Sequence, residues 1–142
     1  MMYIAVNYVA VIIAAIANMV VGFLWYGPIF GKQWVAMMGW TPQQIQEAQK
    51  KGMTKSYVIA IIGSLLTACV LAELSVVVGS YLGLTGVLAG LKAGFIGWIG
   101  FVVPMALSTV AWEGKSWKLW TLNVGYYLVS LLIMGIILGW WM

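Results

Sequence analysis

The sequence predicts an all-α integral membrane protein, a bundle of four transmembrane helices that forms one domain over residues 1–142. Hydrophobic residues make up 64% of the chain and charged residues only 7%, whereas soluble domains carry roughly 25% charged residues. In addition, four nearly uncharged stretches each exceed the roughly 20 residues that an α-helix needs to cross a bilayer. These stretches are residues 3–26, 56–79, 86–111 and 119–141.

The first stretch is predicted to be an uncleaved membrane span. Ala15-Ile16-Ala17 resembles the cleavage site of a signal peptide, but no basic residue precedes the apolar run. The run also continues past that site to Tyr26, which is too long for the apolar core of a signal peptide. Gly27-Pro28 then predicts the end of this helix, because proline cannot continue the helical hydrogen bonds.

The connection over residues 27–55 is predicted to contain a short polar helix at about residues 42–51. Thr41 and Pro42 are typical of an N-cap and a first helical position, and Gln44 completes a capping box. Gly52 is placed to end the helix as a C-terminal cap. Because the helix is mostly polar, we expect it at or beyond the lipid headgroups, as a solvated connector or as a docking site for a partner.

The distribution of lysine predicts the orientation. Six of the seven lysines lie in two connections, residues 27–55 and 112–118, whereas the turn at residues 80–85 carries no charge. Lysine concentrates in cytoplasmic loops, so both charged connections are expected in the cytoplasm and both termini outside. Amphipathic aromatic residues cluster at the same boundary, and the predicted interfacial anchors are Trp25, Tyr26, Trp34, Trp112 and Trp117.

Glu73 and Lys92 are the charged residues inside the predicted spans, where each costs about 2.5–3.5 kcal/mol on insertion scales. Each lies six residues from the outer end of its span, so their Cα atoms are expected at a similar depth, ~9 Å below that end. An ion pair that fixes the register of the two helices would satisfy both residues. Alternatively, Lys92 extends toward the outer headgroups, and Glu73 is protonated or bonded to a polar group such as Asn7.

Small residues predict where helices approach closely. Gly86, Gly90 and Gly94 recur at every fourth position of the third span, and Gly135 and Gly139 repeat this spacing in the fourth. The sequence leaves open whether this surface meets the same chain or a second copy.

Other polar and helix-breaking residues have simpler roles. Pro104 predicts a kink in the third span. Asn18 and Asn123 are expected to form hydrogen bonds between helices.

The composition argues against an enzyme. The chain has no histidine and no aspartate, so neither a metal-ligand cluster nor a nucleophile–base pair can be assembled from the usual residues. We therefore predict no catalytic residue, no cofactor and no metal, and we expect Cys69 to be a packing residue. Lysines without any arginine do not indicate a nucleic acid partner. The expected partners are the lipid bilayer and further copies of the chain.

Motifs at both ends of the chain resemble a known family. The first motif begins with Asn7 through Gly22 and continues through Trp25-Tyr26, Phe30-Gly31, Trp34 and Met38-Gly39-Trp40, before a polar helix. The second is Trp117 to Tyr126, with Asn123-Val124-Gly125-Tyr126. Both are similar to the small bacterial membrane family catalogued as domain of unknown function 1761. This resemblance implies a four-helix protein of the inner membrane, and no activity, ligand or catalytic residue comes with it.

Two functions remain compatible with the sequence. The first is a structural or interaction role as an oligomeric helical bundle, because each unusual residue has a packing or anchoring explanation. The alternative is a small transporter or channel that uses Glu73 and Lys92 as an intramembrane polar site, since ionisable residues within spans often mark ion or substrate paths.

Overall fold

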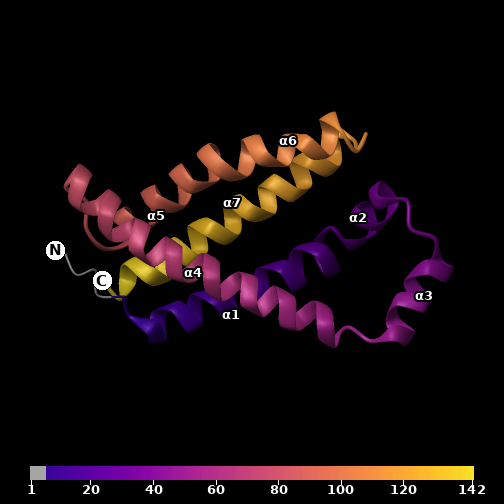
Figure 1. Ribbon diagram of the computed structural model, residues 1–142, viewed down its shortest axis with the longest axis horizontal. Coiled ribbons are helices and arrows are strands. Elements are labelled where there is room, and N and C mark those ends of the chain that lie inside the picture. The colour runs from indigo at the N-terminus through magenta and orange to yellow at the C-terminus, as the bar shows by residue number, and fades with distance from the viewer. Residues whose placement is uncertain (1–5) are drawn as a thin grey trace.

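The computed structural model describes residues 6–142, and the predicted start of the first span at Tyr3 lies outside them. All regular secondary structure in the described residues is helical (Figure 1). The order is α1 (Tyr8–Leu24), the π-helix η1 (Trp25–Ile29), α2 (Gly31–Met38), α3 (Pro42–Lys51), α4 (Thr54–Leu82), α5 (Gly86–Gly97), the π-helix η2 (Trp98–Val102), α6 (Val103–Ala111) and α7 (Trp117–Trp140).

The prediction of four membrane-spanning helices is confirmed at the level of length and composition. Four continuous helical segments are long and apolar enough to cross a bilayer: Tyr8–Ile29, Thr54–Leu82, Gly86–Ala111 and Trp117–Trp140. Two of these segments are composite, because η1 extends α1 and η2 joins α5 to α6.

The four segments form an elongated bundle with two different ends. Helix α7 packs against α5 and α1, and α4 packs against α1 and α5. The C-terminus and the α4–α5 turn lie at one end, which we call the terminal end (Figure 1). Helices α2 and α3 and the α6–α7 turn lie at the other, which we call the loop end (Figure 1).

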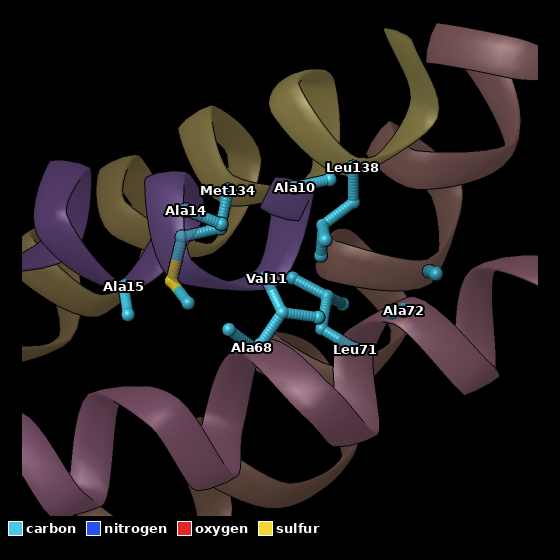
Figure 2. Close-up of a cluster of buried hydrophobic side chains, with 10 residues drawn as sticks. Ala10, Val11, Ala14, Ala15, Ala68, Leu71, Ala72, Met134 and Leu138 are labelled. Atoms are coloured by element: carbon cyan, nitrogen blue, oxygen red, sulfur yellow. The ribbon is translucent and has the colours of Figure 1, made fainter. Parts of the chain in front are cut away.

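Small side chains dominate the core where α1, α4, α5 and α7 meet. Figure 2 shows how the alanines of α1 and α4 let these helices approach, while Met134 and Leu138 of α7 fill the remaining space. The buried cluster consists of Ala10, Val11, Ala14, Ala15, Ala68, Leu71, Ala72, Ala93, Met134 and Leu138. In a membrane, lipid tails are as apolar as leucine, so this close packing contributes much of the association between helices.

The glycines of α5 and α7 meet each other inside the chain. A Cβ atom added to Gly90 would overlap the carbonyl oxygen of Gly135, and one added to Gly94 would lie 2.8 Å from the carbonyl oxygen of Leu131. A Cβ atom on Gly139 would likewise overlap the carbonyl of Gly86. The glycine surface is therefore used within the chain, which answers the alternative that the sequence left open.

Prolines account for both π-helical segments. Pro28 lies inside η1, where Gly27 leaves the helical region at φ −111° and ψ −105°, so the first span bends at the predicted stop and continues to Ile29. In the third span, Pro104 lies two residues after the end of η2 and cannot donate a backbone hydrogen bond to the preceding turn. A π-helical turn is one of the few ways in which a helix absorbs such a defect.

Three features differ from the predicted boundaries. Helix α4 runs from Thr54 to Leu82, beyond the predicted 56–79, because Gly83 at φ +68° ends it and Gly79 stays helical. The missing Cβ of Gly79 lets the α4–α5 turn fold back, since an added Cβ would lie 2.7 Å from the carbonyl oxygen of Leu84. Helix α2 was not predicted, and α7 begins at Trp117 rather than residue 119.

Helix α3 spans Pro42–Lys51, and its capping box joins Thr41 to Gln44.

Candidate functional site

A polar cluster joins three spans near their midpoints. Nδ2 of Asn18 on α1 donates a 2.7 Å hydrogen bond to Oγ of Ser64 on α4. Oδ1 of Asn18 accepts hydrogen bonds from the Tyr126 hydroxyl, at 3.0 Å, and from the Ser130 hydroxyl, both on α7. Each member has a partner in a region where water is scarce, so the cluster fixes how these helices face each other.

A second set of bonds attaches η1 and η2 to α7. The Tyr26 hydroxyl donates a 2.7 Å hydrogen bond to Oδ1 of Asn123. The indole Nε1 of Trp25 donates to the backbone carbonyl of Leu122, at 3.1 Å, and that of Trp98 donates to the carbonyl of Val124, at 2.8 Å. These three bonds hold both π-helical segments against one short stretch of α7.

These attachments border an open cavity of about 690 Å³ at the loop end, which we call the aromatic cavity. Its walls come from η1, α2, η2, α6 and α7, and six of its side chains are aromatic. They are Tyr26, Trp34, Phe101, Trp120, Tyr126 and Tyr127. The remaining wall residues are Met38, Val102, Met105, Ala106, Thr109 and Asn123.

Both π-helical segments contribute to this one cavity. Tyr26 belongs to η1, and Phe101 and Val102 belong to η2. Because π-helical turns occur frequently at functional sites, their convergence marks the aromatic cavity as a candidate site.

Two N–H donors among the residues that line the cavity have no hydrogen-bond partner in the protein. Oδ1 of Asn123 is occupied by Tyr26, whereas its Nδ2 makes no hydrogen bond to the protein. Nε1 of Trp120 is buried and has no partner either, in contrast to the indoles of Trp25 and Trp98. A buried donor without a partner is costly. Trp120 lines the cavity, but its Nε1 atom is buried behind the ring rather than exposed in the cavity.

The structure places Glu73 and Lys92 apart, on exposed faces of α4 and α5. No ion pair within 4.0 Å joins them in the described part of the chain. Neither residue lines the aromatic cavity or the groove between α4, η2 and α7. The arrangement of a single copy therefore leaves both charges facing outward.

Asn7, the third member of the predicted polar site, caps a helix. Its side-chain oxygen accepts hydrogen bonds from the backbone N–H groups of Val9, at 3.0 Å, and Ala10, at 3.2 Å. These bonds occupy two of the first N–H groups of α1, which have no partner within the helix. In the described residues, Asn7 thus caps α1 and forms no hydrogen bond with Glu73.

The predicted interfacial anchors fall into two groups. Trp112 and Trp117 are 88% and 61% exposed, as expected for residues that face lipid headgroups. Trp25, Tyr26 and Trp34 instead pack inward, with ring centroids of Tyr26 and Trp34 only 4.8 Å apart. Three of the five predicted anchors therefore pack against other parts of the chain, and Tyr26 and Trp34 line the aromatic cavity.

Sequence reasoning missed Tyr126 and Trp120 as members of a site, and Ser64 and Ser130 as partners of Asn18. The serines had a detectable signal, since each lies near the middle of a span, at a depth that matches Asn18. The two aromatic residues had none, because their role depends on the bend of η1 and η2. Within residues 6–142, no group of three or more Cys, Asp or Glu residues is placed to hold a metal ion.

Comparison with known proteins places the chain in a family. The model of the family described as "Protein of unknown function (DUF1761)" matches residues 9–139. The chain belongs to this family. The match confirms the resemblance of the N-terminal and C-terminal motifs, and it covers the polar cluster and the aromatic cavity. No curated protein and no solved structure matches the chain.

Proposed function

We propose that the protein has a structural or interaction role as a homo-oligomeric bundle, in which α4 and α5 of one copy pack against α5 and α4 of a second. The observation that carries the proposal is that the only two charged residues well inside the described spans both lie on exposed helix faces. A second copy would cover both charges with their opposites.

Each charge lies in a row of exposed apolar residues. On α4, the row is Leu66, Val70, Glu73 and Val77, and on α5 and η2 it is Leu88, Lys92, Phe95 and Ile99. The residues of each row are spaced by four, three and four positions, which keeps them on one side of a helix. The opposite side of each helix is buried: Ala68, Ala72, Ser75 and Gly79 on α4, and Ala89, Gly90, Ala93 and Gly94 on α5.

A second copy would compensate the two charges better than lipid does. A lone charge inside a span costs about 2.5–3.5 kcal/mol, whereas two opposite charges ~4 Å apart attract by about 4 kcal/mol at an effective dielectric constant near 20. In a symmetric pair of copies, each copy provides Glu73 and Lys92, so two such contacts form. Because the glycine faces of α5 and α7 are already used within the chain, the rows on α4 and α5 are the remaining contact surface with paired chemistry.

The depths of the two charges are compatible with this contact. Gly79 lies opposite Ala89, because a Cβ atom on Gly79 would be 3.0 Å from the Cβ atom of Ala89. Counted from this level, Glu73 lies six residues and Lys92 three residues toward the loop end, so their depths differ by ~4.5 Å. If the two copies are related by a symmetry axis along the membrane normal, each residue lies at the same depth in both copies. The flexible four-carbon side chain of lysine can then span the offset of ~4.5 Å between Lys92 and Glu73 of the other copy.

The proposed orientation places the loop end in the cytoplasm and both termini outside, in the inner membrane of a bacterium. Six of the seven lysines lie at the loop end: in α2 and α3, in the first turns of α4 and α7, and in the connection between α6 and α7. Lysine is enriched in cytoplasmic loops, which supports this orientation.

Mixing two charge variants tests the proposed contact between copies. Glu73→Lys alone and Lys92→Glu alone place like charges opposite each other and should weaken self-association at least tenfold. An equimolar mixture of the two variants restores both opposite-charge contacts, so it should form mixed pairs about as tightly as the wild type. Association is measured in mild detergent by analytical ultracentrifugation, with differently labelled variants.

The outcomes separate this proposal from its competitors. Glu113→Lys is the matched control, because Glu113 lies in the connection between α6 and α7 and should not affect association. If the mixture stayed as weakly associated as the single variants, the contact between Glu73 and Lys92 would be wrong. A wild-type protein that remains monomeric at all concentrations would reject the oligomer itself.

The alternative function, a small transporter or channel that uses Glu73 and Lys92, also requires a second copy. Neither residue lines the aromatic cavity or the α4–η2 groove of one chain, so a path along them must be enclosed by another chain. The Glu73→Gln variant tests this alternative. If the variant still self-associates but loses a proton-dependent flux that the wild type shows in liposomes, the alternative is favoured over a purely structural role.

A further inference from the structure

We propose that the aromatic cavity is a binding site for a neutral, ring-bearing molecule with a carbonyl acceptor, which is the chemistry of a quinone. This site lies at the loop end and is separate from the charged rows of α4 and α5. It therefore does not depend on self-association.

The size and the access of the cavity suit a molecule that arrives from the lipid. Its volume of about 690 Å³ lies within the roughly 300–1,000 Å³ typical of small-molecule sites. Phe101 and Met105, on η2 and α6, line the cavity and are 67% and 73% exposed. Because these two residues belong to a membrane-spanning segment, this side of the cavity opens toward the bilayer.

The walls favour a flat ring. The ring of Tyr26 contacts those of Trp34 and Tyr126, with ring centroids 4.8 and 5.2 Å apart, respectively. Trp120 and Tyr127 add further aromatic surface from α7. Aromatic rings pack well against another ring, in offset or edge-to-face arrangements, and offer less to a purely aliphatic chain.

The polar groups favour an acceptor. Nδ2 of Asn123 is held in place because its Oδ1 is bonded to Tyr26, and this nitrogen has no protein partner. Nε1 of Trp120 is a buried donor without a partner in the same wall. A carbonyl oxygen beside Asn123 would accept from its amide, and a small turn of the Trp120 indole would supply a second donor.

The absence of charged residues from the cavity lining favours a neutral molecule over an organic cation. Aromatic walls alone would also suit a cation, through attraction to the faces of the rings. However, no charged residue lines the aromatic cavity, and the two unpartnered groups present the positive ends of N–H bonds. A cation in this cavity would therefore lose its hydration without an opposite charge beside it.

Calorimetric titration of the purified full chain in lipid-free detergent tests the site with menadione, a naphthoquinone. We expect saturable binding with one menadione per chain. Trp120→Phe keeps an aromatic ring but removes the donor, and it should weaken binding by about five- to tenfold. Asn123→Leu should weaken binding by a similar factor. Trp112→Phe is the matched control, because Trp112 is 88% exposed and lies outside the cavity, so binding should not change.

Three further titrations define the class of ligand. 2-Methylnaphthalene has the ring without the carbonyl groups, dihexanoyl phosphatidylcholine has carbonyl groups without the ring, and tetraphenylphosphonium is an aromatic cation. Each should bind at least about tenfold more weakly than menadione. Equal binding of methylnaphthalene would overturn the role of the donors, equal binding of the phospholipid would replace the quinone by a lipid, and tighter binding of the cation would overturn the neutral class. Absence of saturable menadione binding would overturn the site.

Discussion

Asn18 and Ser64 are joined by a 2.7 Å hydrogen bond from Nδ2 to Oγ, which ties the middle of α1 to α4. The oxygen of the same amide accepts from Tyr126 and Ser130, so one side chain connects three of the four spans. Inside a bilayer, no water replaces a broken bond, and the partners of Asn18 would remain as unpaired polar groups.

Asn18→Leu should lower the free energy of unfolding by about 2 kcal/mol, since hydrogen bonds between membrane helices contribute roughly 0.6 kcal/mol each and this change removes three of them. Reversible unfolding in mixed detergent and dodecyl sulfate measures the loss. Thr67→Val is the control, because the Thr67 hydroxyl bonds only to the carbonyl of Gly63 in its own helix. Equal stability of the two variants would contradict the role given to the cluster.

Gly90→Ala should separate α5 from α7 and destabilise the bundle by roughly 1–3 kcal/mol, because the added methyl group would overlap the backbone of Gly135. Gly63→Ala is a matched control, since nothing lies within 4 Å of a Cβ atom at that position. Alanine is the better helix former, so this control should be neutral or slightly stabilising. Thermal unfolding followed by circular dichroism compares the two, and a tolerated alanine at residue 90 would show that the contact with α7 is looser than described.

Labelling of single cysteines in intact cells should report the orientation of the bundle. In a Cys69→Ala background, Ser80→Cys at the terminal end should react with a membrane-impermeant maleimide, because that end is expected outside. Gln46→Cys in α3 should react only after the cells are permeabilised. The reverse pattern would place the termini in the cytoplasm, and the Cys69→Ala background alone should remain unlabelled.

The number and approximate extent of the spans were predictable because each depends on local composition. A stretch of about 20 apolar residues must be helical in a bilayer, where every backbone N–H and C=O needs an internal partner. The predicted end of the second span at Gly79 is wrong, because a glycine can either end a helix or allow close packing within it. Gly83 ends the helix, and the missing side chain of Gly79 instead allows the close contact with the α4–α5 turn.

The candidate sites were only partly predictable. The sequence identifies Glu73 and Lys92 because a charge within a span is unusual. Whether they pair within one chain depends on which way each helix faces, which the sequence does not give. In the structure, both side chains face outward. Tyr26 and Trp34 were identified as interfacial anchors from their position near a span end, whereas the structure packs them inward.

The sequence by itself determined a four-span membrane protein, its family and the small-residue faces that pack, because composition and spacing act locally along each helix. Only the tertiary structure decided that the glycine faces meet within one chain, that Asn18 joins three helices, and that two π-helical turns line one aromatic cavity. These features depend on the rotation of each helix about its axis and on the bends at η1 and η2. Both are set by the packing of residues about a hundred positions apart, such as Tyr26 and Asn123.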